Sequence, residues 1–101
     1  MTWVDEYRFG EDFDDLRTDP VRAGRLAREL ASELSSGHPL FGQAVTIVAQ
    51  AKPQDEVVLT TDSAVYLVHL TWASRRERPP WPTVHAFLSA AEFEDEIRYR
   101  Y

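Results

Sequence analysis

The chain of 101 residues contains no cysteine. Disulfides, thiolate nucleophiles and cysteine-based zinc or iron–sulfur sites are therefore excluded. No apolar run approaches the 18 residues that a membrane-spanning helix needs. The residues after Met1 also lack the basic patch and apolar stretch of a signal peptide. These absences predict a cytoplasmic protein that makes no use of a membrane.

The length fits one domain, residues 1–101, and a hydrophobic content of 44% is ordinary for a globular chain. The net charge is −6, and such a surface repels nucleic acid and anionic membranes. Nucleic acid is therefore an unlikely partner. The oligomeric state does not follow from these numbers.

Most of the negative charge lies in residues 1–19, which we call the acidic arm, and residues 20–101 are expected to form the α+β core. The arm carries seven acidic residues and two arginines, interleaved with large apolar side chains such as Trp3, Tyr7 and Phe9. One interpretation is that the rings attach the arm to the domain. The other is an acidic, aromatic docking surface for a basic partner. A short helical turn is expected around residues 11–17.

Residues 20–36 have the periodicity of an amphipathic helix. Asp19 can cap its start, Pro20 suits its first position, and Gly37 can end it. The same spacing puts Glu29 and Glu33 on the solvent side. The apolar side comprises Ala23, Gly24, Leu26, Ala27, Leu30, Ala31 and Leu34.

The next residues alternate with the period of strands, at 43–50, 56–61 and 64–72. Their short connections predict an antiparallel meander, and residues 83–88 can add a fourth strand. Ser89 and Glu92 form a capping box for a second helix, which runs to about Arg98. The predicted fold is an α+β two-layer sandwich, in which both helices cover one face of a three- or four-stranded sheet.

Residues that could perform catalysis are few. No G-x-S-x-G motif or glycine-rich phosphate loop is present, and the serines lie at helix ends and turns. We therefore predict no catalytic residue and no cofactor, and an enzyme is the less favoured class. His38, His69 and His85 show no metal-ligand spacing, so no metal is predicted. If strands 64–72 and 83–88 pair, however, His69 and His85 could form an alternative ligand or catalytic site.

Basic and aromatic side chains form a local cluster only around the connection between the third and fourth strands. Trp72, Arg75, Arg76, Arg78 and Trp81 lie there, among three prolines. Such side chains can bind phosphate, stack on bases or dock an acidic segment. Alternatively, the arginines are merely solvated and the tryptophans wedge the loop against the sheet.

Three short motifs add a resemblance. They are H-P-L-F-G at residues 38–42, V-H-L-T-W at 68–72 and P-W-P at 80–82. On these motifs, residues 20–101 resemble a group of small bacterial proteins of uncharacterised function. The resemblance implies that the motifs belong to a shared framework, and it implies no activity.

The sequence therefore favours a non-catalytic bacterial interaction module. Its protein partner would bind the face of Trp72, Arg75, Arg76, Arg78 and Trp81. A specific version is an immunity- or antitoxin-like protein whose acidic arm meets a basic toxin surface. The alternative is a small enzyme or ligand-binding domain with a site near His69 and His85.

Overall fold

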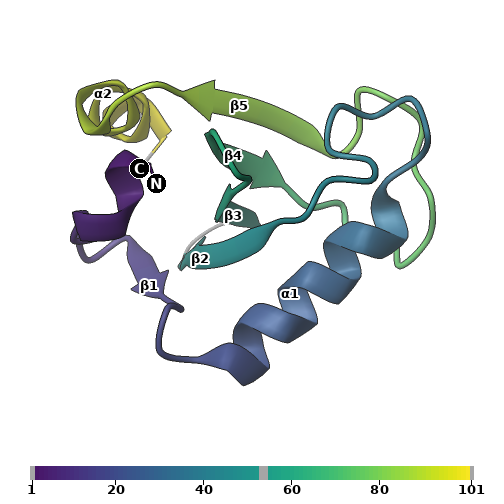
Figure 1. Ribbon diagram of the computed structural model, residues 1–101, viewed down its shortest axis with the longest axis horizontal. Coiled ribbons are helices and arrows are strands. Elements are labelled where there is room, and N and C mark those ends of the chain that lie inside the picture. The colour runs from purple at the N-terminus through teal and green to yellow at the C-terminus, as the bar shows by residue number, and fades with distance from the viewer. Residues whose placement is uncertain (1, 53–54, 101) are drawn as a thin grey trace.

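A computed structural model describes residues 2–52 and 55–100. A five-stranded antiparallel sheet in the order β1-β2-β3-β4-β5 lies between two helices (Figure 1). The elements are η1 (Trp3–Glu6), β1 (Phe13–Asp15), α1 (Pro20–Glu33), β2 (Thr46–Ala51), β3 (Glu56–Thr60), β4 (Val65–His69), β5 (Thr83–Phe87) and α2 (Ala90–Arg100). The predicted α+β class, the meander and its fourth strand are confirmed.

The fifth strand comes from the acidic arm. Residues 13–15 pair with residues 49–51 of β2, so the helical turn expected at 11–17 is wrong. The strand buries the ring of Phe13, which is 5% exposed and packs with residues of β2 in the core. This burial explains why the segment forms a strand. The arm is thus an integral part of the sheet.

The two helices lie on opposite faces of the sheet, which corrects the expectation that both cover one face (Figure 1). Leu26 and Leu30 of α1 pack with Val57 of β3, whereas Phe93 of α2 packs with the neighbouring Val58. Residues of β3 are buried on both sides, which is typical of a central strand covered by two layers.

A bulge in β2 decides which side chains reach each layer. The register with β3 shifts between Ile47 and Ala49, so strict alternation breaks at Val48. Ile47 faces α1, whereas Val48 and Ala49 both join the core beneath α2. The alternation predicted for residues 43–50 placed Ile47 and Ala49 on one side, and the bulge separates them.

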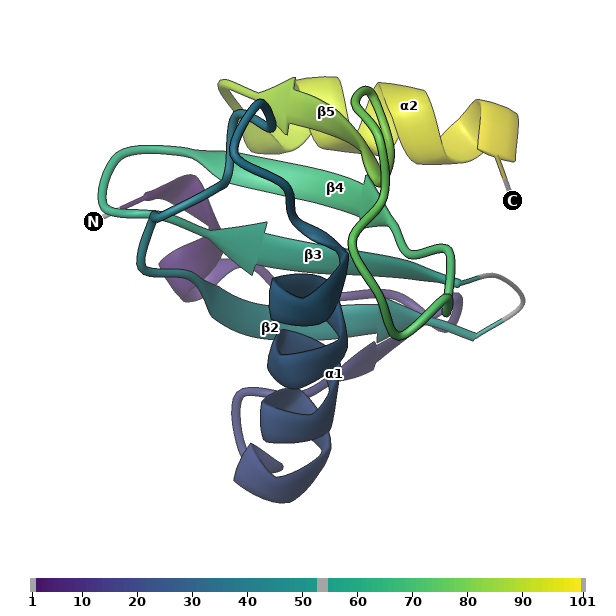
Figure 2. The same ribbon diagram turned by 90° about the vertical axis from the view of Figure 1, so that its right-hand side faces the viewer.

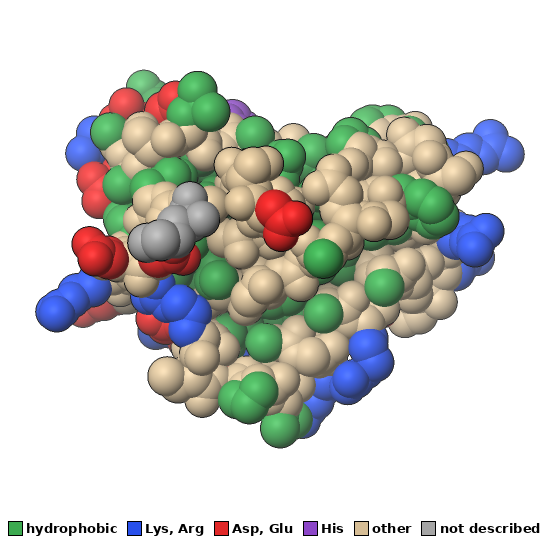
Figure 3. Space-filling view, in the orientation of Figure 1, with side chains coloured by type: hydrophobic (Ala, Val, Ile, Leu, Met, Phe, Trp, Pro, Cys, Tyr) green, Lys and Arg blue, Asp and Glu red, His purple; other side chains and the backbone are tan. Residues whose placement is uncertain are grey.

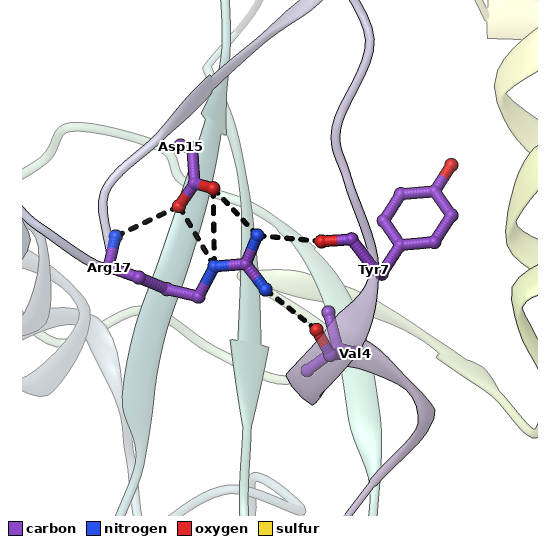
Figure 4. Close-up of polar contacts among 4 residues, drawn as sticks. All are labelled: Val4, Tyr7, Asp15 and Arg17. Atoms are coloured by element: carbon purple, nitrogen blue, oxygen red, sulfur yellow. Dashed lines mark hydrogen bonds and ion pairs between the residues drawn. The ribbon is translucent and has the colours of Figure 1, made fainter.

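Arg17 ties the start of the arm to the end of the same arm, at β1 (Figure 4). Its guanidinium donates to the carbonyls of Val4 at 2.7 Å and Tyr7 at 2.6 Å, and it pairs with Asp15 at 2.6 Å. It also lies 5.3 Å from the centre of the Phe9 ring. These polar contacts are internal to the arm, whereas its attachment to the core depends on β1 and on its apolar side chains, as the first interpretation expects.

The aromatic rings of the arm and of the C-terminal helix α2 meet in one cluster. Phe93 is fully buried, and the centre of its ring lies 5.3 to 6.1 Å from the centres of the neighbouring aromatic rings. These are Trp3, Tyr7, Phe9, Phe13 and Phe87. Edge contacts between rings add to the burial of their area. The cluster therefore holds α2 and the arm on one face.

The predicted caps are present. Asp19 accepts from the Arg22 amide at 3.2 Å at the start of α1, and Ser89 accepts from the Glu92 amide at 3.2 Å at the start of α2. α1 ends at Glu33, three residues before the predicted end, because Leu34 adopts an extended conformation. Within the described ranges, no helix has the length and apolarity to cross a membrane.

Candidate functional site

Residues 70–82, which we call the Trp–Arg loop, connect β4 to β5 at one end of the sheet (Figure 2). The side chains of Trp72 and Trp81 are 44% and 46% exposed. Arg75, Arg76 and Arg78 are also exposed. The structure therefore presents all five predicted binding residues on the surface of one loop.

The loop is held by two carboxylates of α1. Glu33 is completely buried, and its two oxygens accept from the amides of Thr71 at 2.9 Å and Trp72 at 3.0 Å. Glu29 accepts from the amide of Ser74 at 3.0 Å and from its hydroxyl at 2.9 Å. These contacts fix the first half of the loop to the helix.

The two carboxyl groups have opposite pKa shifts. Burial, together with the nearby Glu29, raises the pKa of Glu33 to about 7. The pKa of Glu29 is lowered, first by a hydrogen bond from Glu33 and then by its bonds with Ser74. A protonated Glu33 beside an ionised Glu29 is therefore favoured below neutral pH.

The backbone of the loop is held in an uncommon conformation. Trp72 and Ser74 have φ values of 59° and 54°, in the left-handed region that non-glycine residues rarely adopt. Such conformations cost about 1–3 kcal/mol and persist only where surrounding contacts enforce them. The bonds that Glu33 and Glu29 accept from the amides of Trp72 and Ser74 supply that enforcement.

A buried histidine holds the second half of the loop. His38 accepts from the Leu40 amide at its Nδ1, at 3.0 Å, so its Nε2 carries the proton and donates to the Pro82 carbonyl at 2.6 Å. The turn at residues 38–42 and the Trp–Arg loop thus lie side by side (Figure 2). The segments with the H-P-L-F-G, V-H-L-T-W and P-W-P motifs all meet at this end of the molecule.

The arginines of the loop have no internal partner. Among the described residues, the side chains of Arg75, Arg76 and Arg78 form no hydrogen bond or ion pair. The same is true of the side chains of three arginines elsewhere. Ion pairs engage the remaining four, Arg17, Arg22, Arg98 and Arg100. Lys and Arg side chains without acidic neighbours follow the right-hand edge in Figure 3, whereas Asp and Glu side chains gather on the left, mixed with further Lys and Arg side chains. The loop is a basic region of an acidic protein.

The alternative site does not bring the two histidines into contact with a common group. His85 pairs with Leu67, two residues before His69 on β4, and its ring stacks on Phe87 at 4.5 Å. His69 Nδ1 lies 4.0 Å from the buried carboxylate of Glu56, which is paired with Arg100. The described residues contain no group of three or more acids and histidines that could hold a metal.

The sequence analysis missed Glu33, which it placed on the solvent side of α1. Glu33 follows Leu26 by seven residues and Leu30 by three, which are spacings of the buried face. That periodicity was the available signal. The partner could not be inferred, because the amides of Thr71 and Trp72 are 38 and 39 residues away along the chain.

The chain matches no protein-family model, no curated protein and no solved structure.

Proposed function

We propose that this chain is a non-catalytic, cytoplasmic protein-binding module whose partner docks on the Trp–Arg loop. The observation that supports it is the combination of two half-exposed tryptophans with three unpaired arginines on one anchored loop. Trp and Arg are the residues that most often dominate the energy of protein interfaces. An acidic partner surface would provide carboxylates for the guanidinium groups.

Anchoring of the loop supports the proposal energetically. Binding is weakened when a loop must be ordered on association, because the lost conformational freedom opposes it. Here the bonds of Glu33, Glu29 and His38 order the backbone before a partner arrives. The rings of Trp72 and Trp81 can then be buried with little further ordering.

The test is affinity capture from a lysate of the source cells with two matched triple variants. One replaces Arg75, Arg76 and Arg78 with Ala. The control replaces Arg8, Arg25 and Arg98, which are also exposed, and therefore lowers the net charge by the same three units. We expect a protein that is retained by the wild type and the control and lost by the loop variant. Equal recovery with both triple variants would contradict the proposal.

The immunity- or antitoxin-like version places the partner elsewhere. Its surface is the acidic arm, whose exposed acids include Asp5, Glu6, Glu11 and Asp12. A basic partner would then be captured equally by the wild type and the loop variant, and would be released by salt. Replacement of those four acids with their amides would abolish capture in that case. The two versions thus respond to different variants.

A further inference from the structure

The sheet has an open edge where β1 stops. β1 has only three residues, and its last contact with β2 is the bond from the Leu16 amide to the Val48 carbonyl at 2.9 Å. The chain then turns away into α1 (Figure 1). Among the described residues, no strand pairs with Thr46 and Ile47 on this side. Alternate N–H and C=O groups of residues 45–47 therefore face a vacant strand position.

A groove runs along this edge, between α1 and the start of β2. Two adjoining hollows of about 290 and 370 Å³ form it, and both are lined by Ala27 and Val45. On α1 the groove extends from Pro20 to Ala31. At a rise of 1.5 Å per residue this is about 16 Å along α1, which crosses the strands (Figure 2), and the part beside the vacant edge of β2 is residues 45–47.

Side chains of α1 leave room for an added chain. Ala23, Gly24, Ala27 and Ala31 line the groove, and a Cβ atom on Gly24 would meet nothing closer than 3.6 Å. That nearest atom is Nη1 of Arg28, so the guanidinium of Arg28 lies close to Gly24, although Arg28 itself lines neither hollow. Arg28 is exposed and, among the described residues, has no ion pair.

We propose that this groove binds an extended acidic peptide of a partner protein by β-strand addition. The vacant edge of β2 would supply backbone hydrogen bonds, and the small side chains of α1 would accept every second side chain of the peptide. The unpaired guanidinium of Arg28 selects an Asp or Glu within the bound segment. This surface is separate from the Trp–Arg loop and does not depend on the function proposed for it.

The test begins with a phage-displayed library of random dodecapeptides selected on the full chain. We expect enriched sequences in which apolar residues alternate, with at least one Asp or Glu and no proline in the central five positions. One enriched peptide is then synthesised with a fluorescent label. Its affinity is measured by anisotropy, and its position by amide shifts in ¹⁵N spectra, which should change at Val45, Thr46 and Ile47.

Variants of α1 identify the groove. Gly24→Leu should weaken the binding of the peptide at least tenfold, because the leucine fills the groove. Arg28→Ala should weaken its binding several-fold. Gly24→Leu should fold normally, because Leu favours a helix more than Gly and its Cβ has space. A thermal melt checks this. Val21→Leu is the control, since Val21 is 65% exposed on α1 and does not line either hollow, and it should bind as the wild type does.

Three outcomes would overturn the proposal. The first is no enrichment on the wild type. The second is a peptide that binds Gly24→Leu as tightly as the wild type, or that is lost only with the triple alanine variant of the Trp–Arg loop. The third is a concentration-dependent dimer whose formation shifts the amides of residues 45–47 without peptide, since a second copy would then occupy the edge.

Discussion

Replacing Glu33 with Gln should remove a pH dependence of stability that the wild-type protein shows between pH 5 and 8. Glu33 is fully buried at the end of α1 and holds the amides of Thr71 and Trp72. Burial raises the pKa of its carboxyl group from 4.5 to about 7 in the folded protein. The folded state therefore binds a proton that the unfolded chain has already released over this range.

The sign and size of the effect follow from the two pKa values. Because the folded state binds more protons between pH 4.5 and 7, the free energy of unfolding decreases as the pH rises through this window. The stabilisation from the proton bound to Glu33 is complete below pH 4.5 and is lost above pH 7. Titration curves with these two pKa values give a loss of about 2–3 kcal/mol between pH 5 and 8. The amide introduced by Glu33→Gln cannot titrate, so the variant should lack this component.

Urea unfolding at pH 5, 6, 7 and 8, followed by tryptophan fluorescence, measures the effect. With a typical slope of about 1–3 kcal/mol per molar urea, the wild-type midpoint should fall by about 1 M or more relative to the variant. Parallel pH profiles for wild type and Glu33→Gln would refute the reasoning.

Glu29→Gln provides a matched control for the neighbouring carboxyl group. The pKa of Glu29 is lowered in the folded state, so its contribution to stability is present above pH 4.5 and is lost as the pH falls below that value. Its own titration thus lies outside the window from pH 5 to 8. The control should retain a decrease in stability with rising pH, which becomes smaller because Glu29 no longer raises the pKa of Glu33.

Two further predictions concern the layer beneath α2 and the arm. Phe93→Ala should destabilise the protein by about 3–5 kcal/mol, because it empties the centre of an aromatic cluster. A loss below about 1 kcal/mol in urea unfolding would show that the cluster is not a folded core. Arg17→Met should speed hydrogen exchange of amides in residues 3–15 by about tenfold or more, since it removes the bonds to the Val4 and Tyr7 carbonyls. Exchange no faster than in the exposed-site control Arg25→Met would contradict the role given to Arg17.

Local signals predicted most of the secondary structure. Asp19 and Pro20 mark the start of α1, and Ser89 with Glu92 marks the start of α2, because capping depends only on residues a turn apart. Alternation and short connections predicted the meander for the same reason. The surface position of Trp72 and Trp81 was left open by the sequence, and the tertiary structure decided it by exposing both rings.

The sequence alone determined the two helices, the strands β2 to β5 with their antiparallel order, and the concentration of basic and aromatic residues in one connection. Only the tertiary structure decided that the helices lie on opposite faces, that the arm supplies β1, and that Glu33 turns inward to hold a loop 38 residues away. Periodicity tells which side of an element is apolar but not which neighbour covers it. That choice depends on contacts between segments far apart in the chain, and on a bulge at Val48 that redirects the side chains of β2.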